Sequence, residues 1–270
     1  MDEIITIGRS LVQHGKHNDR AYILSFSEED DSATLDMIEQ LARKNGYTKI
    51  VAKVPEMQAD IFTDMSFAKE GRLENCEYER FYFMSKYLSD RRKQVDNLEE
   101  LESVINSALT AEPKDIKETF EIRPLTKDDI DPQIAIYKTV FKTYPFPIYY
   151  REFIEEMMDS HVSYYGVFED GKMIATASAE LDEKTGLAEM TDFATLPEHR
   201  GKGFAVKLLE KMEEDLEKRG IRSYFTIARA VSHGMNKTFA RCGYTYSGTL
   251  YNNTNINGDI ESMNIWYKVV

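Results

Sequence analysis

The segment Arg200-Gly201-Lys202-Gly203-Phe204-Ala205 constrains the fold most, because it joins a predicted strand at 189–196 to a predicted long helix at 204–219. Its two glycines let the backbone turn sharply and approach a ligand closely. The first amides of such a helix have no partner within the helix, and together with the helix dipole they attract an anion. The loop therefore predicts an α/β arrangement with a pyrophosphate site. Arg200 and Lys202 can add charge there, or can simply be solvated, as most surface basic residues are.

The spacing of the two glycines argues against the better-known nucleotide loops. A P-loop requires Gly-x-x-x-x-Gly-Lys-Ser/Thr and a dinucleotide fold requires Gly-x-Gly-x-x-Gly, and this segment completes neither pattern. A Gly-x-Gly pair alone is weak evidence, since glycines at a strand–helix junction often serve only the turn. Its position before a long helix is what favours the anion site.

Length and charge limit the remaining classes of function. A chain of 270 residues is long for one domain and comfortable for two. The formal net charge of -13 repels polyanions and suits an amine-bearing small substrate, so no nucleic-acid partner is expected. No apolar run approaches the roughly 18 residues that span a bilayer, and the start Met1-Asp2-Glu3 lacks the layout of a secretion signal. These features predict a cytoplasmic protein without a membrane partner, and a homodimer is compatible with them.

Cysteine and histidine usage predicts no metal site. Cys76 and Cys242 are the two cysteines, and neither belongs to a metal-ligand spacing, so free thiols are expected. Cys242 is expected to pack at a helix end rather than to act as a nucleophile. His14 and His17 lack a third ligand nearby in the sequence, and we expect them to be structural or close to the substrate.

The pattern along the chain divides it into three parts. Residues 1–88 alternate strand-like and helix-like stretches and predict an N-terminal α/β domain. Residues 89–119 are polar and helical, which predicts a connector that ends in a linker at Glu112-Pro113-Lys114. A new strand and helix start mark a second domain at 120–270, a mixed sheet with flanking helices. Strands are expected at 21–26, 49–54, 81–88, 163–169, 173–181, 189–196, 224–228, 245–250 and 263–268, and helices at 34–45, 204–219 and 235–242.

The two predicted domains share a similar order of elements, which indicates a weak internal repeat. In the first, a helix, Gly46-Tyr47, a strand, a short helix and Phe83-Met84-Ser85-Lys86-Tyr87 follow one another. In the second, a helix, Gly220-Ile221, a strand, a helix and the strand at 263–268 follow in the same order. The N-terminal domain is therefore a candidate degenerate half-copy of the C-terminal fold. Two unrelated segments that share a common alternation are an equally good interpretation at this stage.

Two motifs in the second domain resemble a known family. Residues 196–205 resemble the acetyl-coenzyme A signature of the GNAT family, Arg/Gln-x-x-Gly-x-Gly/Ala, and residues 235–244 resemble its Asn-bearing segment before a helix that ends in Gly-Tyr. The resemblance covers roughly 150 residues and implies an N-acetyltransferase that uses acetyl-CoA. It also implies that residues 200–205 bind the pyrophosphate, and that a backbone amide among Ala194, Thr195 and Leu196 polarises the thioester carbonyl.

A closer likeness covers the full chain. The segments 13–20, 52–55, 83–87 and 143–148 resemble the beta-lysine N-acetyltransferases. This resemblance implies that the terminal amine of beta-lysine is acetylated to make a compatible solute. Another amine acceptor, such as a polyamine, an aminoglycoside or a protein terminus, is the alternative within enzymes, and a non-catalytic acetyl-CoA sensor is the alternative of another class.

The reaction needs a base, because an alkyl amine with a pKa of about 10.4 arrives protonated. By resemblance, Glu189 is the favoured base and Asp192 the nearby competitor, while Glu189 could also be an ordinary surface carboxylate at a strand edge. Many GNAT enzymes have a general-acid tyrosine where this chain has Phe239, so Tyr244, Tyr251 or solvent is expected to replace it. The remaining expectations are Asn236 beside the pantetheine arm or as a helix cap, and an acceptor-covering loop with Tyr144 and Phe146 as substrate contacts.

Overall fold

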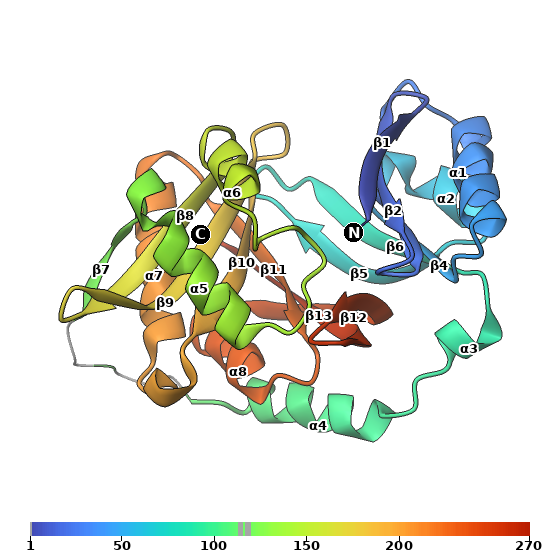
Figure 1. The fold of residues 1–270 in the computed structure, drawn as a ribbon. Helices are drawn as coiled ribbons and strands as arrows, with labels where there is room; N and C mark the ends of the chain where they lie inside the picture. The colour runs from blue at the N-terminus through green and yellow to red at the C-terminus, as the bar shows by residue number, and fades with distance from the viewer. Residues whose placement is uncertain (1, 113–115, 117–119) are drawn as a thin grey trace.

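The computed structural model describes residues 2–112, 116 and 120–270 and contains two mixed β-sheets with flanking helices (Figure 1). The predicted mixed α/β fold is confirmed. Of the predicted linker, Pro113 and Lys114 lie outside the described residues. The first sheet has the order β1-β2-β3-β4-β6-β5, with β1 Glu3–Ile7, β2 Ser10–Gly15, β3 Arg20–Ser25, β4 Lys49–Pro55, β5 Ala68–Glu74 and β6 Arg80–Tyr87.

The second sheet has the order β12-β13-β11-β10-β9-β8-β7. Its strands are β7 Glu121–Pro124, β8 Val162–Glu169, β9 Lys172–Asp182, β10 Leu187–Thr195, β11 Ser223–Arg229, β12 Thr245–Ile256 and β13 Asp259–Val269. The helices of the chain are α1 Ser32–Lys44, α2 Ala59–Asp64, α3 Asp90–Lys93, α4 Leu98–Leu109, α5 Ile130–Val140, α6 Arg151–Met158, α7 Phe204–Lys218 and α8 His233–Arg241, with short 3-10 turns at Glu56–Gln58, Lys127–Asp129 and Pro197–His199.

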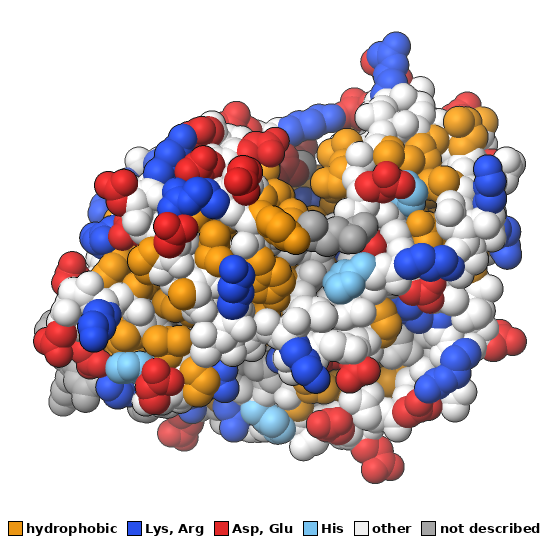
Figure 2. Space-filling view, in the orientation of Figure 1, with side chains coloured by type: hydrophobic (Ala, Val, Ile, Leu, Met, Phe, Trp, Pro, Cys, Tyr) orange, Lys and Arg blue, Asp and Glu red, His pale blue; other side chains and the backbone are white. Residues whose placement is uncertain are grey.

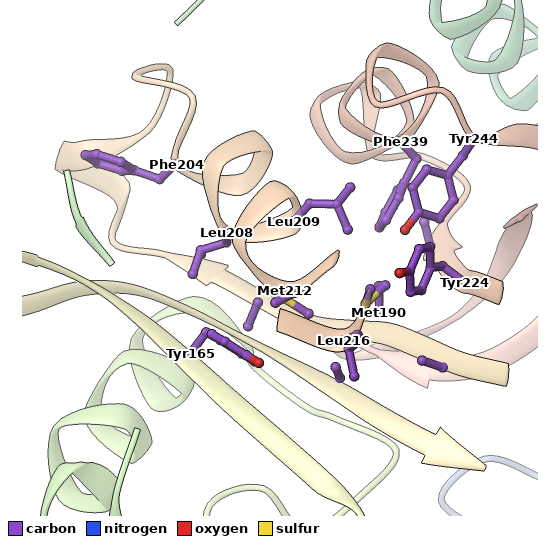
Figure 3. Close-up of a cluster of buried hydrophobic side chains, with 14 of the residues drawn as sticks. Tyr165, Met190, Phe204, Leu208, Leu209, Met212, Leu216, Tyr224, Phe239 and Tyr244 are labelled. Carbon is purple, nitrogen blue, oxygen red and sulfur yellow. The ribbon is translucent and has the colours of Figure 1, made fainter. Parts of the chain in front are cut away.

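Helix α7 forms because its apolar residues recur at helical spacing and face the sheet. Figure 3 shows this face packed onto Tyr165 and Met190 of the sheet and toward Phe239 of α8. The helix ends at Gly220, whose φ of +84° lets the chain reverse. The buried residues of α7 are Phe204, Val206, Leu208, Leu209, Met212 and Leu216.

The two sheets share one topology. Strands β1 to β6 follow one another in the same order and with the same directions as β8 to β13, and each series contains one parallel pair, β3/β4 and β10/β11. In each series a helix, α1 or α7, joins the two strands of the parallel pair. This is the topology that a half-copy of the C-terminal fold would have.

The loops that precede the two matching helices differ in charge. The loop before α1 carries four carboxylates, Glu28, Glu29, Asp30 and Asp31, whereas the loop before α7 carries Arg200 and Lys202 with one carboxylate, Glu198. Asp31 caps α1 by accepting from the amide of Ala33 at 2.9 Å. The N-terminus of α1 is therefore already next to carboxylates of its own chain, which repel an anionic ligand.

The two sheets bury a common core. Phe83 of β6 lies against Phe225 of β11, with ring centroids 6.3 Å apart. Figure 1 shows β5 beside β12 and β13, and α4 running along α8. The shared cluster consists of Val51, Leu73, Phe81, Phe83, Leu187, Phe225, Leu250, Ile256, Met263 and Ile265.

Three buried basic side chains donate hydrogen bonds to backbone carbonyls in a segment of β12 where the strand pairing is interrupted. The register of β12 shifts between Leu250 and Thr254, which leaves carbonyl groups without ladder partners. Lys49 donates to the carbonyl of Tyr251 at 2.8 Å, Arg92 to that of Asn252 at 2.5 Å, and Arg20 to that of Asn253 at 2.9 Å. Because all three cations are buried, these bonds fix the position of one sheet on the other.

Charged side chains of both signs share the surface. On the face shown in Figure 2, Lys and Arg side chains are scattered among Asp and Glu and form no continuous basic patch. In the described part of the chain, no helix combines the length and the apolar character needed to cross a membrane.

Candidate active site

A cavity opens where β10 and β11 separate. The two strands pair in parallel from Leu187 and Ser223 only as far as Glu189 and Phe225. Beyond this point β10 has an irregularity between Thr191 and Ala194 in its pairing with β9. The resulting cavity of about 480 Å³ runs from the glycine loop, between the two strands, toward β12 and β13. Its lining includes Phe141, Tyr144, Thr191, Asp192, Phe193, Thr195, Arg200, Gly201, Gly203, Phe204, Thr226, Arg229, Ser232, Thr238, Phe239, Ile256 and Met263.

The glycine loop forms one end of the cavity. Gly201 and Gly203 have φ values of +83° and +90°, and Gly203 is the N-cap of α7. Among the described residues no side chain caps this first turn, so its amides face the cavity end. Arg200 also lines the cavity, whereas Lys202 lies 3.5 Å from Glu169 at the surface and does not. This backbone geometry fits a pyrophosphate.

The N–H of Thr195 is the β10 amide that faces the gap. The N–H of Leu196 is taken, because it donates to the carbonyl of Ile174 on β9 at 3.0 Å. Alternation in an antiparallel ladder then turns the N–H of Ala194 toward β9 as well and that of Thr195 away from it. Thr195 lines the cavity, while the side chain of Ala194 is buried in the core. Of the three predicted residues, Thr195 therefore has the placement of an oxyanion donor.

Asp192 lies at the far end of the cavity, held by two hydroxyl groups. Tyr144 donates to one carboxylate oxygen at 2.5 Å and Ser178 to the other at 2.6 Å. Asp192 has a φ of +55°, a left-handed conformation at the irregular point of β10 that turns its side chain into this position. Burial raises the pKa of Asp192, and the two hydrogen bonds oppose that shift. Ser178 could not be foreseen from the sequence, since a serine within a strand carries no signal.

Glu189 is part of a pair of like charges. It lies directly opposite Glu180 in the register of β9 and β10. Burial first, and then the charge of Glu180, raise the pKa of Glu189 to about 8, while Lys53 of β4 opposes the shift. Glu189 is partly buried and does not line the cavity. The structure thus brings Asp192, and not Glu189, to the cavity wall.

Tyr244 is not placed to act as a general acid. Its side chain is 5% exposed and packs in the core beneath α7 and α8, with its ring 5.2 Å from that of Phe239 (Figure 3). Burial raises the pKa of Tyr244 well above its ordinary value, and burial does the same to the pKa of Tyr144, so position alone separates the two residues. Phe239 itself both packs in this core and lines the cavity. Tyr144, by contrast, lines the cavity, and its hydroxyl donates to Asp192.

The side chain of Asn236 is fully engaged within the protein. Its amide nitrogen donates to the carbonyls of Arg229 and Ser232, and its oxygen accepts from Asn264 and Trp266. With these bonds it ties α8 to β11 and β13 and has no donor left for a ligand. The helix cap is Ser232, which accepts from the amide of Met235 at 3.3 Å.

Phe146 also lies outside the cavity. It packs at the margin of the cluster formed by α5 and α6, whereas Tyr144 of the same loop lines the cavity. Cys242 is partly buried, and burial raises the pKa of its thiol to about 12, as expected for a packing residue. The residues of β11, β12 and β13 that complete the cavity, such as Thr226, Ile256 and Met263, were not predicted.

A glycine loop at a helix N-terminus and two diverging parallel strands define an acetyltransferase of the GNAT type, and the family model described as "Acetyltransferase (GNAT) family" matches residues 131–244. The chain belongs to this family and is an N-acetyltransferase. Over 273 residues it is 37% identical to a beta-lysine N(6)-acetyltransferase of Methanococcus maripaludis, covering 100% of this chain and 99% of that protein.

Two further likenesses agree with this assignment. The chain is 31% identical to the N-acetyltransferase YodP of Bacillus subtilis, covering 96% of this chain and 95% of that protein. A crystal structure of a GNAT superfamily phosphinothricin acetyltransferase from Sinorhizobium meliloti, in complex with AcCoA, covers 57% of this chain and 89% of its own, with a TM-score of 0.51 and 16% identity. The latter likeness concerns the fold alone.

Proposed function

We propose that the protein transfers the acetyl group of acetyl-CoA to the N6 amine of beta-lysine. The observation that carries the choice of acceptor is the similarity over the full chain, N-terminal domain included, to a protein named for that reaction. The cavity supports the reaction type, because it connects an anion site at α7 with a carboxylate 2.5 Å from a tyrosine hydroxyl. The net charge of -13 suits beta-lysine, whose two ammonium groups and one carboxylate leave it with a net positive charge.

In direct transfer, different backbone amides of the cavity bind the pyrophosphate and stabilise the negative charge that develops on the acetyl oxygen. The amides at Gly201, Gly203 and the first turn of α7 bind the pyrophosphate of the coenzyme. The acetyl group, supplied as a thioester when the coenzyme is bound, needs a donor for the negative charge that develops on its oxygen, and the N–H of Thr195 faces the gap where that oxygen would lie. No covalent intermediate on the protein is needed.

Asp192 is the base that we favour. The acceptor must lose a proton before its nitrogen can attack, and a carboxylate in the cavity wall can take it, directly or through water. The raised pKa of Asp192 brings its basicity closer to working pH, as a general base requires. The hydroxyl of Tyr144, which shares a hydrogen bond with Asp192, can return a proton to the departing thiolate.

The role of Glu189 gives a prediction about pH. Because its pKa is raised to about 8, Glu189 keeps its proton below that pH and becomes negative above it. The new charge attracts the ammonium acceptor and strengthens Asp192 as a base, so kcat/KM for the acceptor should rise through pH 8.

In Glu189→Gln this step in kcat/KM near pH 8 should vanish. The slower rise caused by deprotonation of the acceptor amine should remain, as measured by pH profiles from 6 to 10. Glu183→Gln, which removes an exposed carboxylate from the turn between β9 and β10, should keep the step. An unchanged profile in Glu189→Gln would contradict this role.

The product suggests a physiological role. Acetylation removes the charge of one ammonium group, so that one ammonium and one carboxylate remain on acetylated beta-lysine. The result is a zwitterion without net charge, suited to accumulation as a compatible solute in the cytoplasm. We include this role in the proposal.

The acceptor is tested by measuring free thiol release with a panel of amines. Beta-lysine, α-lysine, spermidine, an aminoglycoside and a lysine peptide are compared at equal acetyl-CoA concentration. We expect beta-lysine to have the highest kcat/KM, with the acetyl group on N6 by mass spectrometry. Turnover of the peptide without turnover of beta-lysine would reject the proposed acceptor, and coenzyme binding without any thiol release would indicate a sensor.

A further inference from the structure

We propose that the N-terminal domain completes the acceptor site, with Gln13 and His17 as positioning residues that hold Tyr144 on Asp192. The proposal rests on the proposed function, in that the cavity end at Asp192 receives the acceptor amine. It concerns residues 141–150, which connect α5 to α6 and are called the acceptor loop below.

The acceptor loop depends on partners for its carbonyl groups. Pro145 and Pro147 have no N–H, so this part of the loop cannot be held in a hydrogen-bonded ladder. On one side Thr143 is tied to the turn between β12 and β13, because it accepts from the amide of Asn257 at 3.1 Å and its hydroxyl accepts from the amide of Gly258 at 2.8 Å. The next two carbonyls, those of Tyr144 and Pro145, turn the other way.

Both of these carbonyls are held by the N-terminal domain. Gln13 on β2 is 3% exposed and donates from Nε2 to the carbonyl of Pro145 at 3.1 Å. Nε2 of His17, two residues beyond β2, lies 3.2 Å from the carbonyl of Tyr144, which fixes that nitrogen as the donor. Residues more than 120 positions away in the sequence thus hold two consecutive peptide groups of the loop.

Tyr144 connects these contacts to the cavity. Its backbone is held by His17, its ring lies 4.8 Å from the ring of Phe141, and its hydroxyl donates to Asp192 at 2.5 Å. A shift of the backbone at Tyr144 would therefore move or break the hydrogen bond to Asp192. Geometry of this kind matters because a displacement of about 1 Å can cost a large factor in rate.

Further hydrogen bonds fix the segment around His17 relative to the second sheet. The side-chain oxygen of Asn18, next to His17, accepts from the amide of Asn255 at 2.9 Å. The amide of His17 donates to Asp2 at 3.0 Å. Together with the buried cations that bind β12, these contacts give Gln13 and His17 a fixed position relative to the second sheet. Their role is to hold the loop in place rather than to move it.

A double-mutant cycle tests the proposal. Gln13→Leu removes the donor at similar volume and is expected to lower kcat/KM for the acceptor by about tenfold, the upper range for one hydrogen bond. In a Tyr144→Phe background the same change should cost less than about twofold, because the bond that Gln13 supports is already gone. The KM for acetyl-CoA should not change in any variant.

The variants of His17 provide a second test. His17→Ala should behave like Gln13→Leu, and His17→Asn, which keeps a donor, should restore part of the activity.

Ser247→Ala is the matched control. Ser247 accepts from the amide of Arg72 across the domain interface at 2.9 Å, far along β12 from the acceptor loop, so its loss should leave acceptor kinetics unchanged. The cycle is run with whichever amine the wild type acetylates best, so failure of beta-lysine as the acceptor leaves this test intact. Equal costs of Gln13→Leu in both backgrounds, or a parallel rise in the KM for acetyl-CoA, would overturn the proposal. If Gln13→Leu does not fold, as judged by thermal unfolding, the His17 cycle gives the decision.

Discussion

Acetyl-CoA is expected to bind roughly a thousandfold more weakly to Gly203→Asp, because two like charges about 4 Å apart cost about 4 kcal/mol near a protein surface. Gly203 has a φ of +90° at the start of α7, where the amides face the pyrophosphate site. A side chain here is strained by the backbone and would also clash with the side chain of Ile116. Isothermal titration calorimetry with acetyl-CoA and with coenzyme A measures the loss directly.

Two further variants separate the causes. Gly203→Ala adds a side chain without a charge, so its affinity should lie between those of the wild type and Gly203→Asp. Gly220→Asp places the same side chain at a φ of +84° beyond the other end of α7, where a Cβ meets open space, and should bind acetyl-CoA normally. Full affinity in Gly203→Asp would show that the coenzyme lies elsewhere.

Asp192→Asn should lower kcat by about 10²- to 10⁴-fold, the range expected for loss of a general base. The amide oxygen of Asn can still accept from one of the two hydroxyl groups, and its nitrogen can donate to the oxygen of the other, so the local structure should survive while the basic group is lost. Affinity for acetyl-CoA should remain, because the glycine loop forms the opposite end of the cavity. Steady-state kinetics at saturating acetyl-CoA, with calorimetry for the coenzyme, check both parts.

Glu189→Gln decides between the two carboxylates. If Asp192 is the base, Glu189→Gln should retain most of its activity below pH 8, where Glu189 is protonated in the wild type. Near-normal turnover in Asp192→Asn, combined with loss of turnover in Glu189→Gln at every pH, would transfer the role of base to Glu189.

The sequence predicted the strands with apolar alternation well, and it missed those that depend on distant partners. Strand β5, Ala68–Glu74, reads as polar and has one fully buried side chain, Leu73. It is a strand because β6 pairs with it on one side and β12 and β13 pack beside it on the other. Strands β1 and β2 were also missed, although the internal order of the elements after them was recognised. Local pattern cannot report such long-range contacts.

The same limit applies to the site. The glycine loop was found because its chemistry lies within six consecutive residues. Asn236 was expected beside the coenzyme, but the partners that engage it, Asn264 and Trp266, come from β13. Asp192 was predicted only as a competitor of Glu189, since a non-glycine φ of +55° at an irregular strand position has no sequence signature. Spacing places a residue on an element, and tertiary packing decides which way its side chain faces.

The acidic loop before α1 has a consequence for stoichiometry. A chain built from two topologically matching halves could be expected to take up two coenzyme molecules, but Asp31 caps α1 and Glu28, Glu29 and Asp30 surround that helix start. The first sheet therefore shares its strand order with the coenzyme-binding sheet but has carboxylates, not basic residues, at the matching helix start. Each polypeptide should titrate with one equivalent of acetyl-CoA. The first sheet instead contacts the second one, through bonds such as those of Lys49 and Arg20 to carbonyl groups of β12.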